Sequence, residues 1–516
     1  MFDPHEFHQN KHTWMWKSQR QEMTISGQGE YHRYFTIIIS PPNKRLKYCF
    51  ALNSDDENLV YGELGFQNQD EVIEHWNCFF YPYLHQADAY KAPDWVKDTI
   101  WYQIFPDRYN ALPTIGHWPS GSVTNAIHYG GNLKGIKDKL KYIHDLGCTG
   151  LYLTPIFLSP TSHKYDTSDY FKIDPCFGTE DDLIDLVKEA HLLGIKVMLD
   201  GVFNHTGVKF EPWISAKKDS NSPYRDWFNI SDKAYETFSF AKNMPKLNTS
   251  HPEVIDYFCK VGQYWIQKAD IDGWRMDVAN EISPQFLKQF RKAVRSVKEV
   301  YILGEVWHDS NPWLMGDQFD AVMNYPYTRL IMDFIITQKI SLDQFKKRVD
   351  DYLNRYASPI YINQFNLFDS HDTVRIMTVA NHNQQKIKQA LALLFISKGS
   401  PCIYYGTEIG LVGLNDPDCR RLMQFNPDPV NHPLYTFIQT FINLRKKYSS
   451  LSYKGSWLWI NHASLLIIQR DDLILIVNPL DSSFENPYNG VDLYNDSHSE
   501  KIEPYDIKLI KYSNTL

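Results

Sequence analysis

An arginine and an aspartate stand two residues apart in the segment Gly273-Trp-Arg-Met-Asp277. The apolar residues around them predict a short buried strand, and residues two apart on a strand point to the same face. Arg275 and Asp277 should therefore form an ion pair aimed at one spot. Such a pair is most often structural, because buried charges need partners. It indicates chemistry only if other segments bring matching polar groups to the same place.

Three further predicted strand ends carry such groups: Asp200-Gly-Val-Phe-Asn-His205, Gly304-Glu-Val-Trp307 and Asp369-Ser-His-Asp372. Together, the four strand ends supply three carboxylates, a guanidinium and two imidazoles, from Asp277, Glu305, Asp372, Arg275, His205 and His371. This set suits cleavage of a glycosidic bond, in which a protonated carboxyl protonates the leaving oxygen and an ionised carboxylate faces the cationic carbon. Crowding drives the pKa values of neighbouring carboxyls apart and so supplies both states. We expect Asp200 and Asn204 to be scaffold.

The elements that must position these groups alternate between strand and helix from residue 94 to residue 449. We expect strands at 99–105, 150–154, 195–200, 271–276, 300–304, 319–323, 364–368 and 401–405, with helices that include 133–146, 179–194, 252–269, 283–297, 373–397 and 433–447. This pattern predicts an α/β fold, a (β/α)8 TIM barrel with its active groups at the carboxyl ends of the strands. A doubly wound sheet is the alternative, but no glycine-rich phosphate loop follows the first strand.

Three segments lie outside this alternation. Residues 206–250 form a polar excursion after the third strand, equivalent to an inserted B domain. Residues 1–93 predict a small N-terminal β-sandwich-like domain, and residues 450–516 predict a C-terminal all-β domain, because both contain short alternating strands.

Composition and charge exclude several functions. The 516 residues carry a formal net charge of −8, which gives no basic footprint for nucleic acid. The seven cysteines form no C-x-x-C pair, so neither a disulfide framework nor a zinc knuckle is indicated. The sequence predicts neither a membrane span nor a signal peptide. We therefore expect a cytoplasmic protein without a cofactor.

These segments resemble the α-amylase family of retaining α-glucan hydrolases, glycoside hydrolase family 13, from about Arg45 to about Phe425. The resemblance is strongest to the neopullulanase, cyclomaltodextrinase and maltogenic amylase subgroup. It is carried by the motifs Met244-Pro-Lys-Leu-Asn248, Asp277-Val-Ala-Asn-Glu281, Phe319-Asp-Ala-Val-Met-Asn-Tyr-Pro326 and Asn415-Asp-Pro-Asp-Cys-Arg420. The resemblance implies hydrolysis of maltodextrins, cyclodextrins and pullulan, through a covalent glucosyl-enzyme intermediate.

The resemblance also implies a role for each site residue. Asp277 would be the nucleophile, Glu305 the general acid/base, and Asp372 the third carboxylate, which binds hydroxyls of the distorted sugar. The same ring would be held by His163, Tyr165, His205 and His371, with Tyr165 stacked beneath it, while Arg275 orients the nucleophile. Asp416 and Arg420 would bind the next sugar outward, and Trp307 would stack on the acceptor side. Val278 resembles the residue of enzymes that also accept α-1,6 bonds.

Alternatives and departures remain within this resemblance. A maltodextrin glucosidase or oligo-1,6-glucosidase is the nearest other enzyme, and a non-catalytic sugar-binding relative is the alternative from another class. The loop from Asp107 to Trp118 is poor in clustered oxygen ligands, so we expect no metal at the site. The subgroup's N-terminal sandwich looks truncated here, beginning around Trp14 to Arg33. The exposed remnant would favour a homodimer anchored by aromatic residues, namely Trp14, Trp16, Tyr31, Tyr34 and Phe35.

Overall fold

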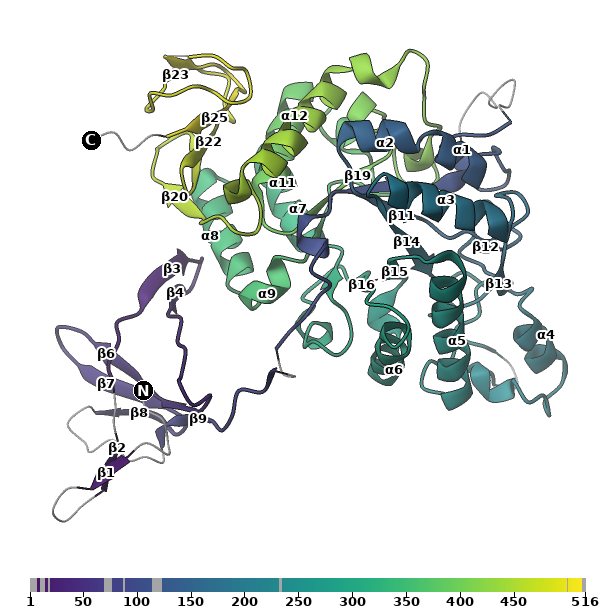
Figure 1. The fold of residues 1–516 in the computed structure, drawn as a ribbon, viewed down its shortest axis with the longest axis horizontal. Helices are drawn as coiled ribbons and strands as arrows, with labels where there is room; N and C mark the ends of the chain where they lie inside the picture. The colour runs from purple at the N-terminus through teal and green to yellow at the C-terminus, as the bar shows by residue number, and fades with distance from the viewer. Residues whose placement is uncertain are drawn as a thin grey trace. The chain divides into compact units, whose positions relative to one another are not determined.

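The computed structural model describes residues 7–9, 14–16, 19–68, 77–86, 89–113, 123–231, 234–498 and 500–512. The chain divides into two compact units, Met1–Tyr90 and Lys91–Leu516 (Figure 1). The second unit contains the barrel, its excursion and the C-terminal strands.

Eight parallel strands form the centre of the second unit. They are β10 (Trp101–Ile104), β11 (Gly150–Leu153), β14 (Lys196–Gly201), β15 (Gly273–Met276), β16 (Tyr301–Gly304), β17 (Ala321–Val322), β18 (Phe365–Asn366) and β19 (Ser400–Tyr404). Their order is β17-β16-β15-β14-β11-β10-β19-β18, and a parallel bridge between Met323 and Phe365 joins the two edges. The predicted (β/α)8 barrel is therefore confirmed, and each strand overlaps the range expected for it.

The strands are short and apolar because they are covered on both faces. Inside the ring, large side chains fill the core, among them Trp101, Tyr152, Met198, Tyr301 and Phe365, all fully buried. Helices surround the strands (Figure 1). They are α1 (Leu133–Asp138), α2 (Leu140–Leu146), α3 (Glu180–Leu192), α5 (Pro252–Ala269), α6 (Pro284–Arg295), α7 (Tyr325–Ile331), a π-helix (Met332–Ile336), α8 (Leu342–Leu353), α9 (Ser358–Tyr361), α10 (Ile376–Val379), α11 (Gln384–Ile396) and α12 (Pro433–Lys447).

Local sequence explains where several helices begin and where two expected helices break. Thr179 and Asp182 form a capping box at the start of α3. The helix expected at 133–146 is divided at Lys139, whose backbone leaves the helical region. The helix expected at 373–397 is divided into α10 and α11, because Asn381 and His382 adopt positive φ angles of 49° and 60°. Apolar spacing did not reveal either break.

Two excursions from the barrel face the carboxyl ends of the strands. After β11, strands β12 (Phe157–Leu158) and β13 (Asp169–Ile173) form an antiparallel hairpin that was not predicted. Its connecting loop carries His163 and Tyr165. After β14, the expected excursion contains α4 (Glu211–Lys218), and a bridge pairs His205 with Lys246. The excursion therefore returns to the strand end from which it departs.

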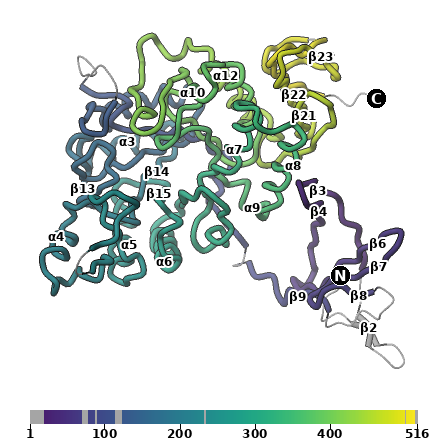
Figure 2. The backbone as a smooth tube through the Cα atoms, turned by 180° about the vertical axis from the view of Figure 1, so that it is seen from behind, coloured from purple at the N-terminus to yellow at the C-terminus, as the bar shows by residue number. Residues whose placement is uncertain are grey.

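The C-terminal strands form an antiparallel sheet in the order β20 (Leu458–Ile460), β21 (Leu466–Arg470), β22 (Leu473–Val477) and β25 (Ile507–Lys511), beside a β23 (Phe484–Glu485) and β24 (Lys501–Ile502) pair. In both views this sheet lies next to α8 (Figure 2). The Trp459 indole donates to Asp350 Oδ1 of α8 at 2.7 Å, and the Gln389 amide donates to the Asn478 carbonyl at 2.6 Å. These bonds fix the sheet to the helical layer of the barrel.

The N-terminal unit is built from small antiparallel sheets. Their strands are β1 (Phe7–Gln9), β2 (Trp14–Trp16), β3 (Thr24–Gln28), β4 (Arg33–Thr36), β5 (Leu46–Tyr48), β6 (Phe50–Asn53), β7 (Asn58–Gly62), β8 (Gly65–Asn68) and β9 (Phe79–Tyr81). The pairs are β1-β2, β3-β4 and β5-β9, and β6, β7 and β8 form a three-stranded sheet. In the described parts of the chain, we find no helix that combines the length and apolarity needed to cross a membrane.

Candidate active site

The fully buried Arg275 side chain joins three carboxylates at the carboxyl ends of β14, β15 and β16. Its Nη1 donates to Asp277 Oδ1 at 2.8 Å and to both Asp200 oxygens at 3.0 Å. Its Nη2 lies 2.8 Å from Glu305 Oε2. The two acidic residues expected to do the chemistry, Asp277 and Glu305, are therefore held on the two terminal nitrogens of one guanidinium group.

The Glu305 carboxylate is fixed by two further donors. The backbone N–H of Val278 donates to Oε2 at 2.9 Å, and the indole N–H of Trp307 donates to Oε1 at 3.0 Å. Val278 has φ 45° and ψ 44°, a left-handed conformation that is strained for a β-branched residue. The tight turn immediately after Asp277 therefore aims a backbone donor at Glu305.

A second polar group lies after β18, around His371 and Asp372. The Gln103 amide donates to His371 Nδ1 at 2.8 Å, which leaves the proton on Nε2, 3.1 Å from Asp372 Oδ2. The Tyr165 hydroxyl also contacts His371 Nε2 and donates to Asp200 Oδ2 at 3.2 Å. Burial and the nearby Arg420 lower the pKa of His371 well below its usual value, so this imidazole is neutral.

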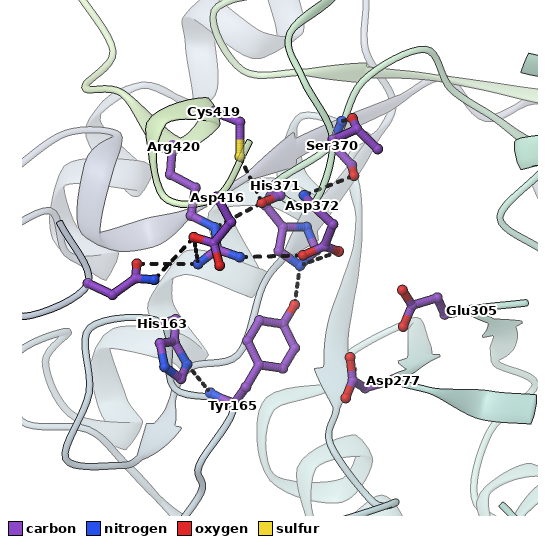
Figure 3. A network of polar contacts seen from close by, with 12 residues as sticks. His163, Tyr165, Asp277, Glu305, Ser370, His371, Asp372, Asp416, Cys419 and Arg420 are labelled. Atoms are coloured by element: carbon purple, nitrogen blue, oxygen red, sulfur yellow. Dashed lines mark hydrogen bonds and ion pairs between the residues drawn. The ribbon is translucent and has the colours of Figure 1, made fainter. Parts of the chain in front are cut away.

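Arg420 connects this second group to the surface. It lies 2.8 Å from Asp416 Oδ1 and 3.4 Å from Asp372 Oδ1, and its Nε donates to the His371 carbonyl at 2.9 Å. Figure 3 shows this network of polar contacts, with Asp277 and Glu305 facing each other beside it. His163 is placed next to Tyr165, whose backbone N–H donates to His163 Nδ1 at 3.0 Å.

His205 lies at the end of β14 and is almost fully buried. Its Nε2 is 4.0 Å from Asp277 Oδ2, and the Phe238 ring stacks on its imidazole with ring centroids 4.8 Å apart. Burial lowers the pKa of His205 to about 3, so it faces Asp277 as a neutral hydrogen-bonding group.

The three carboxyl groups around Arg275 are buried together beside one positive charge, so their ionisations are not independent. Burial raises the pKa of Asp277 well above its usual value, against the opposing effect of Arg275, and raises that of Asp200 to about 6. Glu305 contributes a further negative charge that raises both pKa values. The cluster therefore retains a proton at a pH at which separate carboxyls would be ionised. An acid and a base can thus coexist within it.

An exposed aromatic face borders Glu305. Trp307 is 47% exposed, and its ring stacks on Tyr325 with centroids 3.6 Å apart and planes at 4°. The stack holds the indole flat while its N–H is bonded to Glu305. A flat apolar face next to an acid is the arrangement that binds a sugar ring by stacking.

The structure brings together all the residues predicted for the first sugar: Asp277, Glu305, Asp372, His163, Tyr165, His205, Arg275 and His371. Trp307, Asp416 and Arg420 extend the site on either side. Sequence reasoning missed Gln103, Tyr152, Tyr325 and Asn125. Tyr152 donates to Asp200 Oδ2 at 2.6 Å, and Asn125 donates to Asp416 Oδ1 at 3.1 Å. Of these four residues, Tyr325 lies within the motif Phe319–Pro326 given above. The spacing of residues in the sequence did not indicate the other three.

The loop from Asp107 to Trp118, where the sequence indicates no metal site, is described as far as Pro113. Asp107 accepts from Arg108 Nε at 2.7 Å and from the backbone N–H groups of Tyr129 and Gly130. Its oxygens are therefore already used. Residues 114–118 of this loop lie outside the described residues. Within the described ranges, no group of three or more His, Cys, Asp or Glu side chains is arranged to hold a metal ion.

A (β/α)8 barrel with paired carboxylates at its carboxyl rim is the arrangement of a glycoside hydrolase. The family profile described as alpha amylase, catalytic domain, matches residues 103–452, and that described as alpha amylase, N-terminal ig-like domain, matches residues 5–85. The second match begins earlier in the chain than the sequence motifs indicated.

Three relatives illustrate the similarity. A cyclomaltodextrinase of Geobacillus thermopakistaniensis is 46% identical over 465 residues, covering 87% of this chain and 78% of the relative. An intracellular maltogenic amylase of Bacillus subtilis is 42% identical over 498 residues, covering 93% and 82%. A solved cyclomaltodextrinase structure superposes with a TM-score of 0.87 at 36% identity, covering 97% of this chain and 90% of that one. The chain therefore belongs to the α-amylase family of glycoside hydrolases.

Proposed function

We propose that this enzyme hydrolyses α-1,4-glucosidic bonds of short maltodextrins and cyclodextrins, with retention of configuration at the anomeric carbon. The observation that carries the proposal is the pairing of Asp277 and Glu305 on the two ends of the Arg275 guanidinium. Retaining glycosidases hold their two carboxyls roughly 5 Å apart, close enough for one to attack the carbon while the other protonates the leaving oxygen. A pair bridged by one guanidinium suits that short spacing.

In the first step, Asp277 attacks the anomeric carbon while Glu305 gives its proton to the glycosidic oxygen. The carbon–oxygen bond to the leaving sugar breaks as the bond to Asp277 forms. In the second step, the Glu305 carboxylate takes a proton from water, and the resulting hydroxide displaces Asp277 from the glucosyl unit. Arg275 offsets the negative charge that returns to Asp277.

The sugar at the point of cleavage would be held by the neutral groups around Asp277. His205 and His371 can donate hydrogen bonds from their ring N–H groups to sugar hydroxyls, and Asp372 can accept hydrogen bonds from sugar hydroxyls. Tyr165 would lie beneath the ring, beside His163. Asp416 and Arg420 would bind the next sugar outward, and Trp307 would stack on the sugar of the leaving group or of an acceptor, so transfer to sugars is a side reaction.

Product analysis on β-cyclodextrin, pullulan and soluble starch tests this proposal. We expect maltose-sized products, with cyclodextrin degraded faster than starch. Starch degraded much faster than cyclodextrin would assign the chain to a different specificity. Release of single glucose units only would favour a maltodextrin glucosidase, and sugar binding without turnover would favour a non-catalytic relative.

We also propose a homodimer formed through the N-terminal unit. Among its described residues, large apolar side chains are exposed, including Tyr31, Ile38, Leu64 and Phe66. We propose that these side chains contribute to the dimer interface. The predicted anchors Trp14 and Trp16 have side chains outside the described residues, whereas Tyr31 and Phe35 are 88% and 52% exposed. Light scattering at micromolar concentration should give twice 60.6 kDa, and a clean monomer would overturn the dimer.

We propose that the protein is located inside the cell, because the similar Bacillus subtilis maltogenic amylase is named intracellular. Fractionation of cells that express the protein under its own promoter would place the activity in the cytoplasmic fraction. Activity found in the culture medium would contradict this proposal.

A further inference from the structure

Asn125 lies in the loop after β10 and closes the ion pair between Asp416 and Arg420. Its Nδ2 donates to Asp416 Oδ1 at 3.1 Å, and its Oδ1 accepts from Arg420 Nη1 at 3.4 Å. The amide orientation follows from the charges, because the reverse orientation would place a carbonyl against a carboxylate and an amide N–H group against a guanidinium. A single amide therefore satisfies both members of the pair at once.

Asn125 is itself held by a buried frame. Its carbonyl accepts from Ser162 Oγ at 3.0 Å, and the carbonyl of the preceding Thr124 accepts from Arg108 Nη2 at 2.9 Å. The fully buried Arg108 also donates to the Arg420 carbonyl at 3.3 Å. Three loops, from after β10, β11 and β19, thus meet at this point. The backbone at Asn125 is thus tied to the β11 loop, and its side-chain amide is tied to the β19 loop.

Asp416 needs such support, because its side chain is 44% exposed and, apart from Asn125, Arg420 is the described residue that holds it. Its second oxygen accepts no hydrogen bond from the part of the chain that the structure describes. A carboxylate fixed through one oxygen and open at the other is prepared to accept hydroxyl groups from a sugar. Fixing it in advance removes the entropy cost of ordering it when the sugar binds.

We propose that Asn125 is a positioning residue for the sugar one unit beyond the cleaved glucose, and that it makes a two-glucose donor the preferred substrate unit. The inference rests on the proposed function. It concerns binding of the outer sugar and leaves Asp277 and Glu305 untouched. A substrate that fills only the cleavage position does not reach Asp416, so its kcat/KM should not depend on Asn125.

Two chromogenic substrates separate these effects. 4-Nitrophenyl α-maltoside fills both donor positions, whereas 4-nitrophenyl α-glucoside fills only the inner one. Asn125→Ala should lower kcat/KM for the maltoside about tenfold, the change expected when one hydrogen bond to a charged group is weakened. Most of the loss should appear in KM. The glucoside should change less than about twofold. Asn221→Ala, an exposed asparagine in the excursion, is the matched control and should affect neither substrate.

Asn125→Asp tests the positioning role through the pH dependence of substrate preference. A purely structural role for Asn125 would not produce such a dependence. The introduced carboxyl faces Asp416, so the two repel when both are ionised. The ratio of maltoside to glucoside kcat/KM should be lowest at neutral pH and recover as the pH falls, because a protonated carboxyl can donate as the amide did. The same ratio for Asn125→Ala should show no such recovery.

The outcomes are distinguishable. If both substrates are cleaved by the wild type but lose the same factor in Asn125→Ala, or lose nothing, Asn125 has no role in positioning the outer sugar and the inference is overturned while the proposed function stands. If the wild type cleaves neither substrate nor any maltodextrin, both fail together.

Discussion

The substitution Asp200→Asn tests whether the buried carboxylates share one electrostatic field. Oxygens of Asp200 and Asp277 lie 3.0 and 2.8 Å from the same nitrogen of Arg275, so these oxygens are at most about 6 Å apart. At an effective dielectric constant of roughly 20, two unit charges at that separation repel by about 3 kcal/mol. This corresponds to roughly 2 pH units of pKa. Removing the Asp200 charge should therefore lower the pKa of Asp277 by an amount of this order.

The consequence appears in the acidic limb of the pH profile. If Asp277 is the nucleophile, as proposed, that limb of kcat/KM reports its ionisation in the free enzyme, so the limb should move to lower pH by about 1 to 2 units in Asp200→Asn. The activity at the optimum pH should fall as well, because Tyr152 and Tyr165 lose their anionic partner and Arg275 loses one of its three. The two effects can be measured separately, because one changes the pH at which kcat/KM falls and the other changes its value at the optimum.

The assay is kcat/KM on β-cyclodextrin between pH 4 and pH 8, for the wild type, for Asp200→Asn and for the exposed control Asp219→Asn. The control should leave the limb in place. An unmoved limb in Asp200→Asn, or one moved to higher pH, would show that Asp200 does not influence the nucleophile and that the shared-field account is wrong.

Three further predictions concern chemistry, stability and metal. Asp277→Asn and Glu305→Gln should each reduce kcat by about a thousandfold or more, with unfolding temperatures near that of the wild type, since each removes a reacting group; near-normal turnover in either variant would refute its assigned role. Burial keeps His205 neutral in the fold down to about pH 3, while the unfolded chain protonates this residue below about pH 6.5, so its contribution to stability is present above that pH and lost as the pH falls. Urea unfolding between pH 7.5 and pH 5 should therefore show the wild type losing about 1.4 kcal/mol per pH unit relative to His205→Asn below pH 6.5, and parallel pH dependences would contradict this. Dialysis against a chelator should leave activity unchanged, and activity lost in chelator but restored by calcium would show that a metal is needed.

The sequence was sufficient to predict the barrel because each of its strands is a short apolar run followed by polar residues. Asp277 and Glu305 stand directly after such runs, and Asp372 ends the polar segment that follows another, so closing the ring brings the three together. What spacing could not reveal is contact between loops that are distant in the chain. Asn125 and Asp416 are an example, since their bond joins the first and last barrel loops.

Asp200 illustrates a second limit. From the sequence, Asp200 was expected to be scaffold. In the structure, its side chain contacts the same arginine as Asp277, so we propose that its charge raises the pKa of Asp277. Whether a buried carboxylate acts as scaffold or as part of an electrostatic cluster depends on distances of a few ångströms, which sequence does not encode.

The central claim is that Asp277 forms a covalent bond to the substrate glucosyl unit. Incubation with 5-fluoro-α-glucosyl fluoride, which slows breakdown of such an intermediate, followed by mass spectrometry of the intact protein and its peptides, tests this claim directly. We predict one added fluoroglucosyl unit per chain, located on the peptide that contains Asp277, and no addition in Asp277→Asn. Label on a different carboxylate, or hydrolysis of the natural substrate with inversion at the anomeric carbon, would contradict it.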